Sequence, residues 1–137
     1  ARIGIAMYGY VDLPTTLQRP HLKPVLSLWA EKISERLVKK GASIGYGQIF
    51  TANCNMFVST YDIGYGNGFF RLDENKEFKI SDGRKILGRV SMNNLAIEGI
   101  DKEICIFDDV KDLAIVHQTI SYEILCRIDP TIERKVI

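Results

Sequence analysis

The sequence has few cysteines, little net charge and no long apolar run, and each shortage excludes a class of protein. Three cysteines, Cys54, Cys105 and Cys126, stand far apart without a CxxC or CxxH pair, so neither a zinc site nor a redox motif is expected. An odd number of cysteines also argues against a disulfide framework and favours buried free thiols in a reducing cytoplasm. The apolar runs are too short for a membrane span, and we expect no signal peptide.

Charge and composition describe an ordinary globular domain. The 18 Lys and Arg residues nearly balance the 17 Asp and Glu residues, which leaves a net charge of +1. Because the basic residues are scattered, we expect no attraction to nucleic acid or to anionic membranes. A length of 137 residues with 46% hydrophobic residues predicts one domain with its own core.

The start of the chain suggests that it belongs to something larger. It begins at Ala1 without a methionine and enters an apolar stretch at once, whereas domain boundaries usually lie in polar linkers. We therefore expect a piece cut from a longer protein. Residues 2–8 predict a short buried strand. Without its neighbours such a strand has unpaired backbone groups, so we expect it to fray or to pair with another chain.

Most of the remaining chain has the pattern of a sheet domain, with short apolar segments separated by turn residues. Strands are predicted over residues 56–63, 90–92, 94–97 and 103–107, a hairpin with Asp82–Gly83 at its turn over residues 78–87, a short amphipathic helix over residues 112–119, and an irregular to extended end over residues 124–137. Residues 24–40 alone are ambiguous, because their apolar residues have helical spacing.

Three tyrosines are the main candidates for chemistry. Tyr46 and Tyr65 lie between glycines, and Tyr122 follows Ser121. A tyrosine between glycines commonly packs over a turn. The alternative is a phenol presented into a cleft, which acts as an acid or base if its pKa, about 10 in water, is lowered. The two histidines, His21 and His117, are isolated in sequence from each other and from any nucleophile, and no metal site is expected.

Six segments, in order along nearly the whole chain, resemble the C-terminal part of bacterial alanine racemases. The segment Asp62–Gly68 is similar to the family's GYADG loop, and Gly88–Asn93 is similar to its GR-[IV]-CMD motif. The other segments are Arg2–Gly9, Leu22–Leu28, Ile44–Ala52 and Thr119–Cys126. Each match is weak alone, but six in the same order are specific.

The resemblance implies a mainly β fold, namely the barrel-like C-terminal β domain of the alanine racemase fold with one or two short helices. Residues 1–20 would be the last strand of a PLP-binding α/β barrel and a connection, and residues 21–137 the β domain. The resemblance also replaces the helix suggested at residues 24–40 by a long strand.

The resemblance further implies a cytoplasmic isomerase that interconverts L- and D-alanine with pyridoxal 5′-phosphate (PLP) and supplies D-alanine for peptidoglycan. The lysine that forms the Schiff base belongs to a barrel absent from this sequence, so we expect the chain alone to be inactive. Arg2 matches the arginine at the pyridine nitrogen. Because arginine keeps its proton, the ring nitrogen stays unprotonated and the cofactor is a modest electron sink. Gly4 and Ile5 match residues whose backbone N–H groups bind the phosphate, and Tyr122 adds its hydroxyl.

The substrate side of the site is implied in the same way. Tyr46 matches the base that takes the α-proton of L-alanine, opposite the lysine. In the family's homodimer this tyrosine and the residue matching Met92, whose backbone helps bind the substrate carboxylate, reach into the neighbour's site. Tyr65 matches a tyrosine that narrows the entryway and so favours small substrates. The sequence departs from the family at Ser91, commonly cysteine, and at Asn93, usually aspartate.

Two other functions stay open. One is a broad-specificity racemase acting on serine, lysine or arginine, which substrate profiling of the full-length enzyme would distinguish. The other is a β-barrel binding module without catalysis. A methionine codon close upstream of Ala1 would favour the module, and a barrel-length extension with a PLP lysine would favour the racemase.

Overall fold

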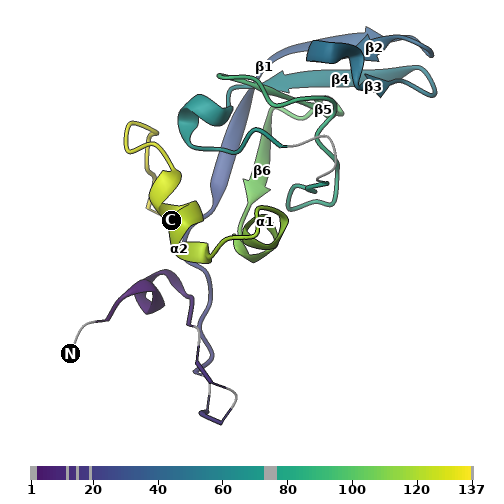
Figure 1. The fold of residues 1–137 in the computed structure, drawn as a ribbon. Coiled ribbons are helices and arrows are strands. Elements are labelled where there is room, and N and C mark those ends of the chain that lie inside the picture. The colour runs from purple at the N-terminus through teal and green to yellow at the C-terminus, as the bar shows by residue number, and fades with distance from the viewer. Residues whose placement is uncertain (1–2, 12, 15, 19, 73–76, 137) are drawn as a thin grey trace.

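A curled, antiparallel four-stranded sheet forms the body of the domain in the computed structural model, which describes residues 3–11, 13–14, 16–18, 20–72 and 77–136 (Figure 1). The strand order is β5-β4-β1-β6, and a separate two-stranded sheet pairs β2 with β3. The elements in chain order are η1 (Ile5–Tyr8), β1 (Leu28–Val38), β2 (Ser43–Ile44), η2 (Tyr46–Gln48), β3 (Phe50–Thr51), β4 (Met56–Tyr61), η3 (Tyr65–Asn67), β5 (Leu95–Glu98), β6 (Glu103–Phe107), α1 (Lys111–Val116) and α2 (Ser121–Arg127), where η marks a 3₁₀ helix. The prediction of a mainly β domain with two short helices is confirmed.

The long strand β1 pairs with a different partner in each half. Leu28–Glu31 lies against β6, and Lys32–Val38 lies against β4, with a register irregularity between Lys32 and Ser34. An irregularity of this kind bends a strand and increases its twist, in keeping with the curl of the sheet. The long strand expected within residues 24–40 is therefore confirmed.

The helix suggested by the spacing within residues 24–40 is wrong. The apolar residues at that spacing do not form a core face, since Ile33 is 60% exposed and Leu37 is 54% exposed. The side chains of β1 that enter the core are Leu28, Ala30 and Val38, of which only Ala30 belongs to the helical spacing. Pairing of β1 with β6 along its first half and with β4 along its second half overrides the local spacing.

The core consists of a large and a small cluster. The large one lies between the sheet, the helices α1 and α2, and the segments that cover them, and its fully buried members include Tyr61, Phe69, Ile97, Leu113 and Ile124. The small cluster packs the sheet of β2 and β3 against the C-terminal end of β1 and the start of β4. Its members are Val38, Ile44, Ala52, Met56, Val58 and Leu87.

The predicted strand over residues 2–8 is wrong for the part that the structure describes. Ile5–Tyr8 is a turn of 3₁₀ helix, in which the backbone N–H of Met7 donates to Gly4 O (3.1 Å). Local hydrogen bonds replace those that a neighbouring strand would supply. This N-terminal segment extends away from the sheet (Figure 1), and the Tyr10 hydroxyl ties it to the body by accepting a hydrogen bond from the backbone N–H of Val110 (3.1 Å).

Some of the other predicted elements are confirmed, and others are shorter than predicted or wrong. The strands of residues 56–63, 94–97 and 103–107 are confirmed as β4, β5 and β6, and the helix of residues 112–119 as α1. The hairpin of residues 78–87 shortens to one bridge, Lys79–Lys85, around the expected turn. Residues 90–92 are not a strand. The irregular to extended end predicted from Ile124 is wrong up to Arg127, where α2 ends, and is confirmed for residues 128–136, which form no helix or strand. The cysteines are free, but Cys54 and Cys126 are exposed rather than buried.

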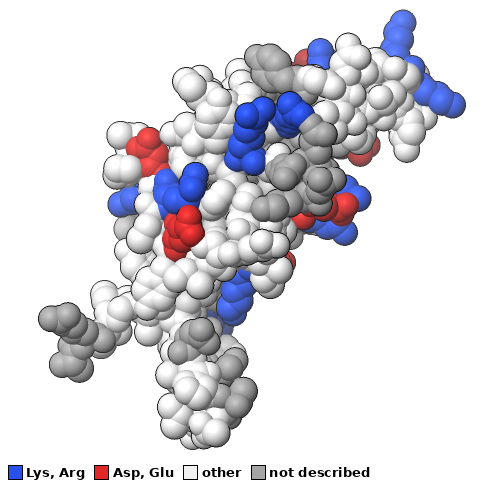
Figure 2. All heavy atoms as spheres, in the orientation of Figure 1, with Lys and Arg blue, Asp and Glu red and all other residues white. Residues whose placement is uncertain are grey.

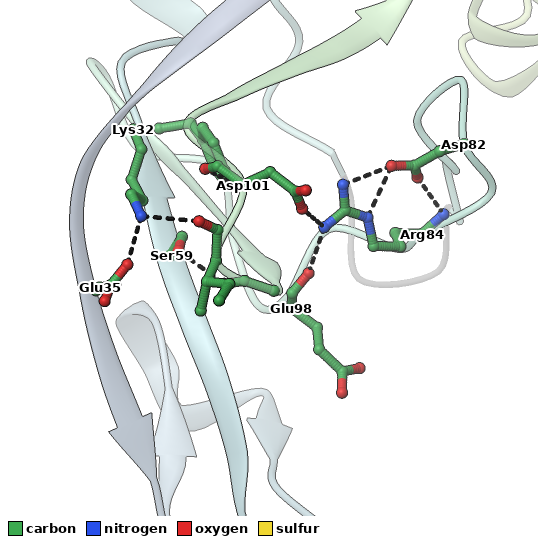
Figure 3. Close-up of polar contacts among 10 residues, drawn as sticks. Lys32, Glu35, Ser59, Asp82, Arg84, Glu98 and Asp101 are labelled. Atoms are coloured by element: carbon green, nitrogen blue, oxygen red, sulfur yellow. Dashed lines mark hydrogen bonds and ion pairs between the residues drawn. The ribbon is translucent and has the colours of Figure 1, made fainter.

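Side chains from three parts of the chain fix the turn between β5 and β6 (Figure 3). Its consecutive carbonyl oxygens accept hydrogen bonds from Arg84 Nη1 (at Glu98, 2.8 Å), Ser59 Oγ (at Gly99, 2.7 Å), Lys32 Nζ (at Ile100, 2.8 Å) and the Tyr61 hydroxyl (at Asp101, 3.0 Å). Arg84 also pairs with the Asp101 carboxylate (2.7 Å) and with Asp82. Hydrogen bonding between Arg84 and Asp82 raises the pKa of the guanidinium and lowers the pKa of the carboxyl. The turn is therefore held to β1, to β4 and to the residue 78–87 hairpin.

The glycine-rich loop Gly64–Gly68 lies between two backbone segments. On one side, the backbone N–H groups of Tyr65 and Gly66 donate to Ser91 O (3.1 Å) and Met92 O (2.7 Å). On the other, Gly68 has a φ of +87° and packs so tightly that a Cβ would lie 1.8 Å from Arg127 O. The loop therefore joins residues 91–92 to the end of α2.

Replacing Tyr61 by Phe should destabilise the domain. The buried hydroxyl donates to Asp101 O, and its loss leaves that carbonyl short of a donor, at a cost of about 1–3 kcal/mol in the free energy of unfolding. Urea unfolding of the chain measures the change. The control, Tyr8→Phe at an exposed tyrosine, should stay within about 0.5 kcal/mol of the wild type. Equal effects of the two substitutions would contradict the role of the Tyr61 hydroxyl.

The domain should lose stability in alkali. Burial raises the pKa of Tyr61 and of Tyr10 above the ordinary 10.0, so the unfolded chain releases these protons first. The contribution of both groups is complete below pH 10 and falls as the pH rises above it. Urea unfolding between about pH 9 and 11 should show this decline, with a smaller slope in the Tyr10→Phe, Tyr61→Phe double variant. The same slope in the double variant would refute this origin.

Gly68→Ala and Gly83→Ala should separate backbone strain from steric overlap. Both glycines have nearly the same φ, +87° and +89°, but no atom lies within 4 Å of a Cβ at Gly83. Gly83→Ala should cost about 1–2 kcal/mol, the ordinary penalty of a left-handed residue. Gly68→Ala should cost at least about 1 kcal/mol more, because Arg127 O must move. Equal losses in urea unfolding would show that the loop and α2 are not in close contact.

Candidate functional site

Tyr46 begins η2, between two glycines that bring the turn close to another segment. Gly45 and Gly47 have φ values of +78° and +77°. A Cβ at Gly45 would lie 3.3 Å from the backbone nitrogen of Arg89, and one at Gly47 would lie 3.7 Å from Arg89 Nη1. The backbone of Tyr46 is thus held beside Gly88–Arg89, whereas its side chain lies outside what the structure describes.

Tyr65 and Met92 come together at the glycine-rich loop. Both side chains are exposed, Tyr65 by 43% and Met92 by 55%, while their backbones are joined through the bond from Gly66 N to Met92 O (2.7 Å). The hydrogen bond from Gly66 uses the carbonyl of Met92 and not its backbone N–H. A backbone N–H is the kind of group that donates to a carboxylate. The peptide of Met92 is therefore oriented by the loop that carries Tyr65.

Ser91, which stands where the family commonly has cysteine, closes the turn that contains Met92. The Ser91 hydroxyl donates to Asn94 Oδ1 (2.8 Å) and accepts from the Asn94 backbone N–H (3.0 Å). A cysteine thiol is a weaker donor and acceptor, so serine suits this turn better. Asn93, the other departure, is exposed in the same turn.

Gly4 and Tyr122 meet although they lie near opposite ends of the chain. Tyr122 is in the first turn of α2, and its hydroxyl lies 3.3 Å from the position of a Cβ on Gly4. Gly4 and Ile5 begin η1, and the first N–H groups of a helix have no partner within the helix. A hydroxyl and backbone donors therefore gather beside a residue without a side chain, an arrangement suited to an anion. Arg2, the fourth residue assigned to this group, lies outside the described residues.

The helix α2 connects the two groups. Tyr122 lies in its first turn beside Gly4, and Arg127 at its end contacts the Tyr65 loop at Gly68. The turn of Tyr46 joins the second group through the segment Gly88–Met92, which contacts both glycine-rich turns.

Sequence reasoning missed a ring stack behind the Tyr65 loop. His117, isolated in the sequence, stacks on Phe70 with ring centroids 3.8 Å apart and 22° between the planes. The Arg127 guanidinium carbon lies 4.3 Å from the centroid of the same ring. No motif links these three positions, and only the fold brings them together.

Surface charge, metal-ligating side chains and helix hydropathy bear on other kinds of site in the part of the chain that the structure describes. Figure 2 shows acidic and basic residues mixed over one face, among larger uncharged areas. Among the residues that the structure describes, no group of three or more His, Cys, Asp or Glu could hold a metal ion. In the same part of the chain no helix is long and apolar enough to cross a membrane.

Comparisons with known proteins agree on one family. Residues 25–136 match the family model of the alanine racemase C-terminal domain. The chain is 51% identical over 134 residues to an alanine racemase of a Nitratiruptor species, which covers 98% of the chain and 39% of that protein. It is 41% identical over 136 residues to an alanine racemase of Campylobacter curvus, which covers 99% of the chain and 40% of that protein.

A solved structure has the same fold. The alanine racemase of Clostridium difficile 630 in complex with cycloserine superposes with a TM-score of 0.79 at 27% identity, over 92% of this chain and 37% of that one. The chain thus spans 39–40% of the length of the two curated relatives. Since the family model covers most of the chain and both relatives are well above 30% identical, the chain belongs to the alanine racemase family and contains its C-terminal domain.

Proposed function

We propose that this chain supplies the C-terminal domain of a cytoplasmic enzyme that interconverts L- and D-alanine with PLP and so provides D-alanine for peptidoglycan. The observation that carries the proposal is that the Tyr122 hydroxyl lies beside Gly4, 3.3 Å from the position of a Cβ on that glycine, since the resemblance assigns these two residues to one phosphate. The family membership of the chain supports the reaction.

The residues around Gly4 suit a phosphate group. The N–H groups of Gly4 and Ile5 would donate to its oxygens, as would the half-exposed Tyr122 hydroxyl. A side chain on Gly4 would crowd that hydroxyl, because its Cβ would lie within 3.3 Å. Arg2 would contact the pyridine nitrogen. When bound, PLP withdraws electrons from the α-carbon of the amino acid and so makes its α-hydrogen acidic.

Racemisation needs proton transfer on both faces of the α-carbon, and we assign one face to Tyr46. The phenolic oxygen of Tyr46 would take the α-proton of L-alanine and return one to that face in the reverse direction. The lysine that serves the D-face would come from the barrel domain. The Met92 backbone would orient the substrate carboxylate, and the exposed Tyr65 phenol would narrow the entryway.

We further propose that the site is completed by a second subunit. Tyr65 and Met92 are exposed in this chain, as expected of residues that face a partner. The outer surface of the sheet also exposes apolar side chains, among them Leu37 and Phe57, which are cross-strand partners in β1 and β4. Exposed apolar groups of this kind are typical of a surface that another domain or subunit covers.

Tyr46→Phe in the full-length enzyme should stop racemisation by removing only the phenolic oxygen. Exchange of the α-hydrogen of L-alanine with deuterium should slow by at least roughly 100-fold, because its base is lost. Exchange at D-alanine should persist, since the lysine remains. Proton NMR in D₂O measures both rates.

The control for this experiment is Tyr8→Phe, which changes an exposed tyrosine outside the proposed site. It should leave both exchange rates unchanged. Wild-type racemisation by a folded Tyr46→Phe enzyme would refute the assignment of Tyr46 as a base.

A further inference from the structure

Phe70 lies two residues after the loop Gly64–Gly68 and is covered on both faces of its ring. His117 stacks at a centroid distance of 3.8 Å, and the Arg127 guanidinium carbon lies 4.3 Å from the ring centroid. Two planar groups at such distances cannot share one face of a ring, so they lie on opposite faces. Phe70, a member of the large core, is only 9% exposed.

The two covering residues come from the ends of the two helices. His117 caps the C-terminus of α1, where its backbone N–H donates to Leu113 O (3.1 Å). Arg127 is the last residue of α2, and its guanidinium lies 3.9 Å from the Glu123 carboxylate one turn earlier. The stack therefore joins α1, α2 and the segment after the loop at one point.

The stack adds a side-chain contact to backbone contacts that already define the loop. Gly68 packs against Arg127 O, and the backbone N–H of Asp129 donates to Asn67 O (3.1 Å). On the opposite side the loop donates to Ser91 O and Met92 O. Tyr65 lies between these two attachments, and its backbone position depends on both.

We propose that Phe70, His117 and Arg127 are positioning residues that fix Tyr65 and thereby set the size of the amino acid that the enzyme admits. The inference rests on the proposed function, in which the Tyr65 phenol narrows the entryway. A cation and an aromatic ring on the two faces of Phe70 attract its π-system and restrict its movement. Because α2 also carries Tyr122 beside Gly4, the same helix connects the entryway at Tyr65 to the residues proposed to bind the phosphate.

The test uses Phe70→Ala in the full-length enzyme. Loss of the ring should loosen the loop, so the kcat/KM ratio for alanine over the larger serine should fall roughly tenfold. The change should lie mainly in KM, because none of the three residues touches the reacting atoms. Hydrogen exchange at the amides of Tyr65, Gly66 and Asn67 should accelerate. Phe70→Tyr retains the ring and should restore both the selectivity and the slow exchange.

A second variant keeps the test decisive if Phe70→Ala does not fold. Arg127→Met removes the cation from an exposed side chain but retains much of its length, and should shift selectivity in the same direction. Arg134→Met, at another exposed arginine near the C-terminus, is the matched control and should have no effect. Wild-type selectivity in folded Phe70→Ala or Arg127→Met enzyme would overturn the inference. A wild-type enzyme that racemises neither alanine nor serine would instead overturn the proposed function.

Discussion

Hydrogen bonds join β1 to β6 through its first half and to β4 through its second half, and the arrangement of the domain depends on this change of partner. The irregularity between Lys32 and Ser34 marks the change. The first half places β6 and the helices that follow it against the large core. The second half places β4, whose end leads directly into the Tyr65 loop. One strand is therefore common to the large core, which includes Ile124 of α2, and to the strand that leads into the Tyr65 loop.

Backbone contacts, more than side-chain contacts, assemble the candidate site. Residues 91–92 accept hydrogen bonds from the Tyr65 loop, Arg127 O lies against Gly68, and the Tyr46 turn approaches Gly88–Arg89. Close backbone approach leaves no room for a Cβ at Gly68, so glycine there is a steric requirement. The tyrosine side chains are carried on turns whose shape is set by the neighbouring backbone.

Stability and function are linked through α2. Its buried residue Ile124 belongs to the large core, Tyr122 meets Gly4, and Arg127 covers the Phe70 ring. A short helix of seven residues has little stability of its own, so packing must hold it. In the proposed enzyme, a shift of this helix would move the phosphate-binding Tyr122 and the Tyr65 loop together.

The sequence by itself determined the features that depend on local chemistry or on ordered motifs. These include the strands β4 and β6, the helix α1 and membership of the alanine racemase family. Gly4 and Tyr122 could be assigned to one group only because the resemblance covers both ends of the chain, since no local signal relates them.

Tertiary structure alone decided the features that need a partner from elsewhere in the chain. The spacing of Ile33 and Leu37 suggests a helix, yet β1 is a strand because β6 pairs with its first half and β4 with its second half. Residues 5–8 are apolar enough for a buried strand, yet they form a 3₁₀ turn with local hydrogen bonds. The stack of His117, Phe70 and Arg127 has no signature in the sequence, because contacts between rings far apart in the chain exist only after the helices have packed.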